Sequence, residues 1–163
     1  MRRTMIHRTT AERAERILQD GLRVGMPLNL TDCGTWAHVW YGTNPVFLAM
    51  PDAPFLDAVP DDGADIAVDA RGLALVADLP SLCDTGGHVD EGVMWWKEGR
   101  EPAGLLPYLD ADGGIEIEYL VDPTADACRA AIGVTLTAAC LSGIAAHRLE
   151  RRHRSGVAAR SPL

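Results

Sequence analysis

Residues 5–21 read MIHRTTAERAERILQDG and predict a short strand that runs directly into a helix. The first three residues are typical of a strand, and alanine and aliphatic residues then recur at helical spacing. Thr9 stands three residues before Glu12, the spacing of a helix-capping box, and Gly21 is a typical C-terminal stop. The pattern places His7 at a strand-to-helix junction, where a side chain can face a cleft.

A second informative segment lies in the last third of the chain. Polar and apolar residues alternate over residues 115–121, which predicts a half-buried strand. Because residues i and i+2 of a strand share a face, Glu116 and Glu118 would point the same way. The simplest interpretation is a solvent-facing pair. The alternative is a pair at a cleft, one carboxylate orienting a substrate and the other stabilising a cation-like transition state.

The composition is that of an ordinary globular protein. The chain has 163 residues, of which 47% are apolar and 23% are charged, enough for one domain with a substantial core. Its net charge of -8 argues against stable, sequence-independent binding to nucleic acid. The first residues include no apolar stretch of signal-peptide length. We therefore expect a cytoplasmic protein with reduced cysteines.

The remaining pattern predicts a single α+β domain over residues 1–150 and a solvated basic tail over residues 151–163. Further strands are expected at 46–49, 66–69, 73–76, 92–96 and 134–141, a second helix at 123–132 capped by Asp122, and a weak helix at 55–58. Residues 24–44 read as a long loop and 78–87 as irregular. Strands in succession favour mainly antiparallel sheets over a Rossmann fold.

Three further classes of site or segment are not expected. Residues 130–146 carry no charge, but they are few and only modestly apolar for a membrane span. No metal site is predicted, because no helix or paired spacing of His, Cys or carboxylate residues supports one. No glycine-rich phosphate loop follows a strand either.

Three segments occur in an order that resembles a known family. They are His7-Arg8-Thr9-Thr10 followed by a helix and Gly21, then Asn44–Ala49, and then Glu118-Tyr119-Leu120-Val121 with Glu116 two residues before its first residue. They are similar to the H-G-T-T opening, the G-V-Y-F strand and the E-x-E-Y-x-V segment of the ADP-ribosyltransferase-like superfamily. That superfamily includes bacterial ADP-ribosylating toxins, poly-ADP-ribose polymerase catalytic domains and RNA 2'-phosphotransferase. The resemblance covers residues 5 to about 145.

The resemblance implies a split pair of mainly antiparallel sheets with a few short helices, and NAD bound in the cleft between them. His7 would hydrogen-bond the adenosine ribose, the backbone of Arg8 would meet the nicotinamide amide, and Thr9 would contact a ribose hydroxyl. Phe47 would stack on nicotinamide in place of the family's tyrosine, with Tyr41 nearby to compensate for the missing hydroxyl.

The implied activity is transfer of ADP-ribose from NAD to a macromolecular or small-molecule acceptor that the sequence does not name, with release of nicotinamide. Glu118 would favour the positive charge that develops on the ribose, and Glu116 would position or deprotonate the acceptor. Two further activities that this fold could support are NAD hydrolysis and RNA 2'-phosphate transfer. The latter needs several basic residues, for which Arg8, Arg23 and Arg71 are the candidates.

Two residues depart from the family pattern. Arg8 replaces a glycine and adds bulk and charge near the predicted pocket, and Phe47 lacks the hydroxyl of the usual tyrosine. Both departures favour a competing class of protein, a non-catalytic binding or immunity module that kept the fold and lost the chemistry.

Overall fold

The computed structural model describes residues 4–25, 40–54, 56 and 63–152. Its strands are β1 (Thr4–Thr10), β2 (Val46–Ala49), β3 (Gly63–Asp69), β4 (Leu75–Ala77), β5 (Gly87–Asp90), β6 (Val93–Trp96), β7 (Gly114–Glu116), β8 (Thr137–Cys140) and β9 (Leu149–Arg152). Its helices are α1 (Ala11–Asp20), α3 (Leu79–Asp84), α4 (Ile117–Val121) and α5 (Asp126–Thr135), with 3-10 turns η2 (Ala103–Tyr108) and η3 (Ala146–Arg148).

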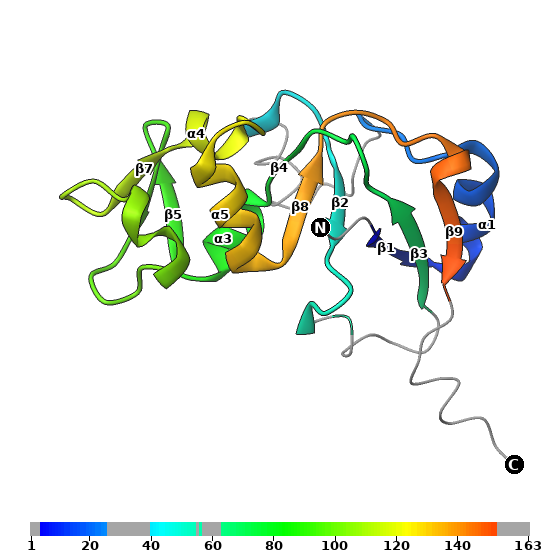
Figure 1. Ribbon diagram of the computed structural model, residues 1–163, viewed down its shortest axis with the longest axis horizontal. Helices are drawn as coiled ribbons and strands as arrows, with labels where there is room; N and C mark the ends of the chain where they lie inside the picture. The colour runs from blue at the N-terminus through cyan, green and yellow to red at the C-terminus, as the bar shows by residue number, and fades with distance from the viewer. Residues whose placement is uncertain (1–3, 26–39, 55, 57–62, 153–163) are drawn as a thin grey trace, which may run out of the picture.

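The strands form two sheets (Figure 1). The large sheet has the order β4-β8-β2-β1-β3-β9, and the small sheet has the order β5-β6-β7. The strand pairs within both sheets are antiparallel. The molecule is therefore an α+β protein with two mainly antiparallel sheets and few helices, as the sequence predicts.

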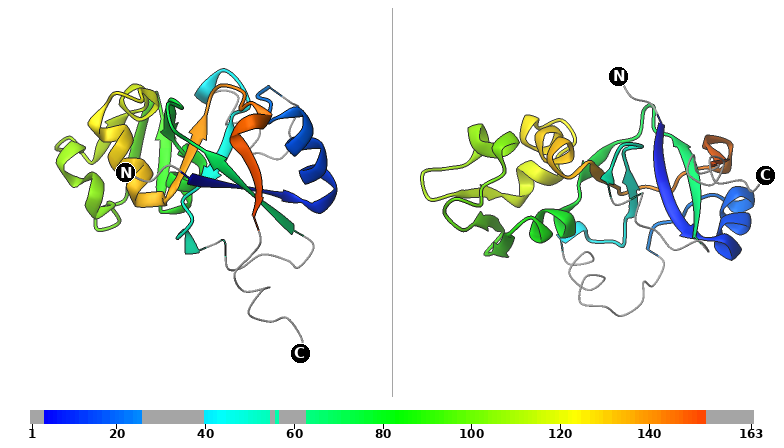
Figure 2. Two further views of the ribbon diagram at one scale, coloured as in Figure 1. Left: turned by 45° about the vertical axis from the view of Figure 1, so that its right-hand side comes forward. Right: turned by 90° about the horizontal axis from the view of Figure 1, so that it is seen from below.

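Helix α5 lies between the two sheets and joins them (Figures 1 and 2). Ala127 and Ala131 face the small sheet, where they share a core cluster with Met94, Trp96 and other buried residues. Cys128 on the same helix packs instead on strands of the large sheet. The small residues of α5 allow both sheets to approach it closely, so one helix serves two cores.

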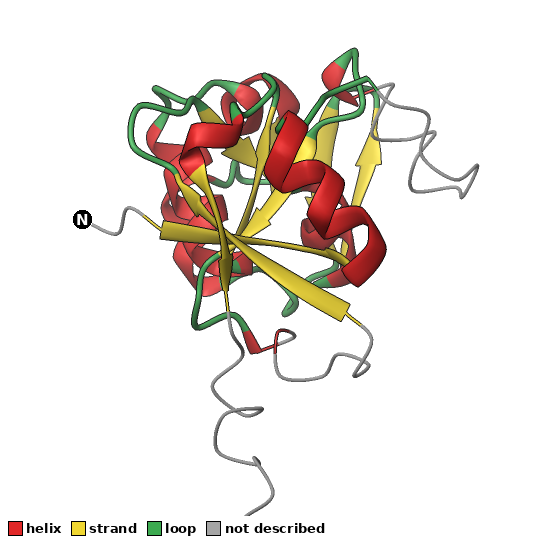
Figure 3. Cartoon of the chain, turned by 90° about the vertical axis from the view of Figure 1, so that its right-hand side faces the viewer, coloured by secondary structure: helices red, strands yellow, loops and turns green. Residues whose placement is uncertain are grey.

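The large sheet buries its other face against α1. Met5, Ile66 and Val68 point to this face, where Ala14 of the helix is fully buried. Figure 3 looks onto the side of the molecule that carries α1 and β9 and shows the twist of the sheet. The β1–α1 unit predicted from residues 5–21 is thus confirmed as one wall of the principal core.

The ends of α1 are set by two local features. The hydroxyl of Thr10 accepts a hydrogen bond from the backbone N–H of Arg13 at 3.2 Å, so Thr10 is the N-cap. The prediction that Thr9 caps the helix was wrong by one residue, because β1 continues to Thr10 opposite Gly63. Gly21 ends the helix at φ +86°, as expected from its position.

The predicted strand at 115–121 is wrong in its second half. Strand β7 ends at Glu116, and α4 begins at Ile117. The partner strand β6 starts at Val93, directly opposite Glu116, so β7 has no strand to pair with beyond that residue. The apolar residues 117, 120 and 121 have helical i, i+3, i+4 spacing, and the helix buries Leu120 completely. Over so short a segment, the order of polar and apolar residues is compatible with a strand and with a helix. The chain forms a helix after Glu116 because the partner strand β6 offers no further residue to pair with.

Other differences are smaller. Residues 78–87, expected to be irregular, contain α3 and the start of β5. The second helix begins at Asp126, after Ala125, because the Asp122 carboxylate instead closes a turn with Thr124. The helix continues to Thr135, so the strand predicted from residue 134 starts three residues later.

Several predictions concern parts of the chain outside the described residues. These are most of the loop at 24–44, most of the helix at 55–58 and the tail from residue 153. At the start of the predicted tail, Arg151 and Arg152 belong to the edge strand β9. The uncharged segment 130–146 divides between α5 and β8. None of the described helices combines the length and the apolar character needed to cross a membrane.

Candidate functional site

Strands β1 and β2 part at the centre of the large sheet. Strand β1 pairs with β3 along all of its residues, from Thr4 opposite Asp69 to Thr10 opposite Gly63. With β2 it pairs at one position, Ile6 opposite Ala49. Beyond this position the two strands no longer form a ladder, and His7 and Phe47 lie on the two sides of the opening. We refer to this region as the β1/β2 opening.

The imidazole of His7 bridges the β1/β2 opening. Its Nδ1 atom lies 3.0 Å from the backbone carbonyl oxygen of Phe47. A carbonyl oxygen only accepts hydrogen bonds, so Nδ1 carries the proton and Nε2 of the neutral ring is an acceptor. Burial lowers the pKa of His7 and outweighs the opposing effect of the Phe47 carbonyl. The ring is therefore neutral near pH 7 and offers Nε2 to a hydroxyl or N–H donor.

Phe47 and Tyr41 are close neighbours, as the sequence suggested. Their ring centroids are 6.4 Å apart in an edge-to-face arrangement. Both rings pack against the buried cluster of Val76, Cys128 and Ala139. Phe47 is half-buried, so part of its ring is accessible.

The hydroxyl of Tyr41 is fully engaged inside the protein. It donates to the carbonyl of Ala77 at 2.6 Å and accepts from the N–H of Leu79 at 2.8 Å. Burial is the main reason why the pKa of Tyr41 is raised well above its ordinary value. This hydroxyl holds the junction of β4 and α3, so Tyr41 would contribute its ring, not its oxygen, to a site beside Phe47.

The side chain of Arg8 points to the opposite face of β1 from His7, because neighbouring strand residues alternate. Its guanidinium binds both carboxylate oxygens of Asp65, at 2.7 and 3.0 Å, and the carbonyl of Leu56 at 2.7 Å. The side chains of Arg8 and Asp65 are 15% and 6% exposed. The expected charge of Arg8 near the pocket is thus neutralised by a buried partner. Thr9, two residues from His7, shares the His7 face and is half-buried.

The two glutamates do not share a face. Glu116 is the last residue of β7, and Glu118 lies in the first turn of α4; neither is buried. Helix α4 reaches the aromatic pair through its last residue, since Val121 packs against the same cluster as Phe47 and Tyr41. Residues i and i+3 of a helix are neighbours on its surface, so Glu118 stands one turn before Val121 on that side.

The structure therefore connects the three predicted motifs through one residue. Phe47 binds His7 with its carbonyl, and its ring joins the cluster on which α4 ends. Sequence reasoning missed Asp65 and Val121. A carboxylate inside the apolar strand ADIAVD was the available signal for Asp65, because buried charges are usually paired.

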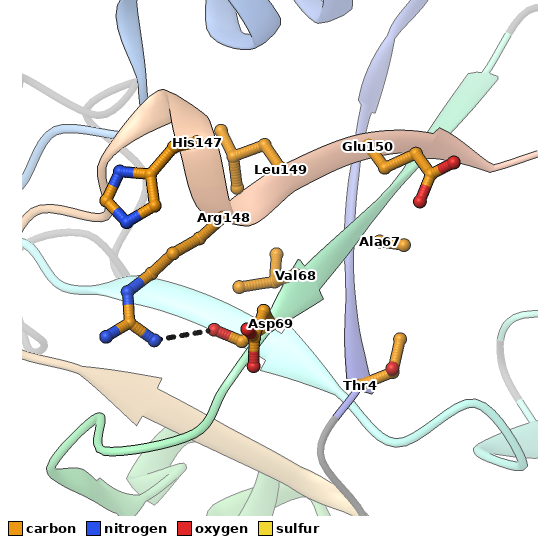
Figure 4. A pocket seen from close by; sticks show the side chains of 8 residues that line it. All are labelled: Thr4, Ala67, Val68, Asp69, His147, Arg148, Leu149 and Glu150. Carbon is orange, nitrogen blue, oxygen red and sulfur yellow. Dashed lines mark hydrogen bonds between the residues drawn. The ribbon is translucent and has the colours of Figure 1, made fainter.

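A separate hollow of about 330 Å³ lies at the other end of β1 (Figure 4). Its floor includes Ala67, and Asp69, Arg148 and Glu150 stand around it. Arg148 already donates to the carbonyls of Asp69 and Arg71, and the Asp69 carboxylate binds the Arg71 guanidinium, which lowers the pKa of Asp69. Arg148 of η3 thereby fastens the segment before β9 to the turn after β3. None of the predicted site residues lines this hollow.

In the described part of the chain no three His, Cys, Asp or Glu side chains gather in a way that could hold a metal ion. Comparisons with models of protein families, with curated proteins and with solved structures give no match to this chain. Any function must therefore be argued from the residues themselves.

Proposed function

We propose that this chain has an ADP-ribosyltransferase-like fold and transfers ADP-ribose from NAD to an acceptor. The observation that carries the proposal is the β1/β2 opening. There a neutral His7, bound to the Phe47 carbonyl through Nδ1, offers an acceptor nitrogen on the α1 face of the large sheet, and the half-buried ring of Phe47 lies on the opposite face at the same opening. A ribose hydroxyl donates hydrogen bonds, and a nicotinamide ring is flat, so NAD has the groups that these two side chains suit.

The residues around the β1/β2 opening fit a dinucleotide in three respects. Nε2 of His7 would accept from a ribose hydroxyl, and Thr9 on the same face has a hydroxyl of its own. The ring of Phe47 lies on the other face of the large sheet and would stack on the nicotinamide of a dinucleotide that passes through the opening. The guanidinium of Arg8 is held by Asp65, so it adds no unpaired charge on the Phe47 face. Its bulk lies against Leu56 and Asp65.

The proposed catalytic group is the carboxylate of Glu118. When bound, NAD supplies a ribose that becomes positively charged as its bond to nicotinamide breaks. A carboxylate beside that sugar favours the charged transition state over the neutral ribose of the substrate. Glu118 stands one helical turn before Val121, which packs on the cluster of Phe47. Glu116, exposed at the end of β7, is the candidate for positioning the acceptor.

RNA 2'-phosphate transfer is less well supported. It requires basic side chains that can bind a phosphate. Two of the three candidates are already bonded, Arg8 to Asp65 and Arg71 to Asp69. Arg23 is exposed. A neutral His7 also adds no positive charge for a phosphate.

The direct test is release of nicotinamide from NAD by the purified protein. Glu118→Gln keeps the size of the side chain and removes its charge, so release should fall at least about a hundredfold if Glu118 stabilises the transition state. Glu98→Gln, an exposed carboxylate in the turn after β6, is the matched control and should leave release unchanged. Equal release by wild type and Glu118→Gln would reject the assignment of Glu118.

Binding of NAD is measured separately, by the shift of the thermal midpoint of unfolding. His7→Ala should abolish an NAD-dependent shift, and Glu118→Gln should retain it. A shift without nicotinamide release points to a transferase that needs its acceptor. The absence of both release and a shift would favour the competing class, a non-catalytic binding or immunity module. The feature that favours this second candidate is Phe47, which lacks the hydroxyl of the family's tyrosine and whose ring lies on the opposite face of the large sheet from His7.

A further inference from the structure

The small sheet has one buried and one open face. Val89, Met94, Trp96 and Ile115 belong to the core cluster or pack against it. Because strand residues alternate, the intervening residues point outward. These are His88, Asp90 and Glu116, which are exposed, and Val93 and Trp95, which are half-buried. We call this set the outer face of the small sheet.

The strand register orders the outer face into two rows. His88, Trp95 and Gly114 are opposite one another in the first row, and Asp90, Val93 and Glu116 in the second. Gly114 has no side chain, and Trp95 lies over it. A Cβ placed on Gly114 would lie 2.7 Å from Cζ3 and 2.9 Å from Cε3 of the indole. Because Gly114 has no side chain, the indole of Trp95 can lie directly against the sheet. In the second row, the carboxylates of Asp90 and Glu116 lie on either side of Val93.

The charges in this part of the sequence are strongly unbalanced. Between residues 87 and 118 the sequence has eight carboxylates and two basic residues, Lys97 and Arg100. Both basic residues follow β6, beyond Trp95, and the side chain of Arg100 lies beside Gly86. Asp90 and Glu116 are in the other row, next to the turn at Glu91 and Gly92. The outer face is thus aromatic in its centre and acidic at one end.

We propose that the outer face of the small sheet is a docking surface for a basic, partly apolar segment of a partner protein. A Lys or Arg side chain over the indole of Trp95 gains a cation–π contact, and Asp90 and Glu116 supply opposite charge beside it. Apolar residues of the segment cover Val93. This inference does not depend on NAD or on Glu118, and it stands if the proposed activity fails.

The acidic charge excludes other classes of occupant. Nucleic acids and anionic membrane surfaces carry the same sign of charge as this part of the chain, so both are repelled. A fully apolar partner would leave Asp90 and Glu116 without counter-charges as they lose water. A basic segment can place a cation over the indole of Trp95 and also pair with the carboxylates of Asp90 and Glu116.

The test uses a synthetic peptide of alternating Arg and Leu residues as the probe and a Glu-Leu peptide of equal length as its control. Two-dimensional NMR of the whole chain follows the backbone amides and the indole N–H of each tryptophan. The Arg-Leu peptide should shift the signals of Trp95, Val93 and Glu116, whereas the indole N–H of Trp96, buried on the other face, should not move. Raising the ionic strength should weaken binding.

Two variants separate the ring from the charges. Trp95→Ala should weaken binding of the Arg-Leu peptide by about tenfold or more. Asp90→Asn combined with Glu116→Gln should weaken it by about three- to tenfold, and both residues are exposed, so this variant tests the idea even if Trp95→Ala does not fold. Glu12→Gln combined with Glu15→Gln on α1 is the matched control and should bind as wild type does.

The proposal is overturned if the Glu-Leu peptide binds equally well, if the shifted signals lie elsewhere, or if the Asp90 and Glu116 double variant binds normally. It is also overturned if the same signals move with protein concentration alone, because the occupant would then be a second copy of the chain.

Discussion

Nδ1 of His7 and the carbonyl oxygen of Phe47 lie 3.0 Å apart across strands that have just stopped pairing. This bond replaces the missing ladder between β1 and β2 and determines which nitrogen of the ring carries the proton. It also links the first two motifs of the sequence, which are 40 residues apart. The relationship has consequences for stability that can be measured without knowing any ligand.

The stability of the protein should fall as the pH decreases through the range in which His7 would become charged. Burial lowers the pKa of folded His7 below its ordinary value of 6.5, so the unfolded chain takes up this proton first. The contribution of His7 to the free energy of unfolding is complete above about pH 6.5 and is lost as the pH falls toward the pKa of the folded protein. Its size is about 1.4 kcal/mol for each pKa unit between the unfolded and the folded state. Urea unfolding at pH 7.5 and pH 5 measures it.

His7→Gln is the control for this prediction. Glutamine can still donate to the Phe47 carbonyl but does not titrate, so the loss of stability between pH 7.5 and pH 5 should be smaller. The same loss in both proteins would mean that His7 is not the group responsible. Nitrogen-15 spectra of the wild type should show a protonated Nδ1 and an unprotonated Nε2.

Removing one partner of the Arg8–Asp65 pair should destabilise the fold strongly. Arg8→Met leaves the Asp65 carboxylate, which is 6% exposed, without its guanidinium. The expected cost is about 3 kcal/mol in the free energy of unfolding, measured by urea denaturation. Replacing both residues, as Arg8→Met with Asp65→Leu, should cost less than the sum of the single changes. Additive costs would show that the pair is not coupled.

Glycine is required at position 21 for two reasons. Its φ is +86°, and a Cβ there would lie 2.6 Å from the carbonyl oxygen of Ile144. Gly21→Ala should lower the free energy of unfolding by at least about 2 kcal/mol. Gly133→Ala should have the opposite sign, a gain of about 0.5–1 kcal/mol, because this helical position has no atom within 4 Å of a new Cβ. Thermal unfolding of both variants measures these two effects. The prediction would be contradicted if both substitutions changed the stability in the same direction and by the same amount.

The Tyr41 hydroxyl should be important for stability. Tyr41→Phe leaves the carbonyl of Ala77 and the N–H of Leu79 without this partner. The expected loss is about 1–3 kcal/mol in chemical unfolding. Tyr119→Phe removes a hydroxyl from a side chain that is 53% exposed and should change stability by less than about 0.5 kcal/mol. If both variants lose the same free energy of unfolding, the hydrogen bonds of the Tyr41 hydroxyl do not stabilise the fold.

Local patterns in the sequence predict a considerable part of this fold. The unit of β1 and α1, the stop at Gly21 and the strands at Val46–Ala49 and Val93–Trp96 are at or close to the expected positions. Each follows from interactions between residues a few positions apart, such as helical periodicity or the freedom of glycine at positive φ. The mainly antiparallel α+β class follows from the order of these elements.

The candidate site is predictable only in part. The neighbourhood of Tyr41 and Phe47 is confirmed, but the shared face of Glu116 and Glu118 is not, because β6 provides no partner beyond Val93 and the chain turns into α4. Segment 115–121 satisfies two periodicities, and only a neighbour from elsewhere in the chain distinguishes them. The same holds for Asp65, which is 57 residues from Arg8.

The sequence alone determined the elements whose stabilising contacts are local. The tertiary structure alone decided which nitrogen of His7 is free, which charge neutralises Arg8 and where the two glutamates point. These outcomes depend on contacts between distant segments. Their free energy comes from burial and pairing, which no short stretch of sequence contains.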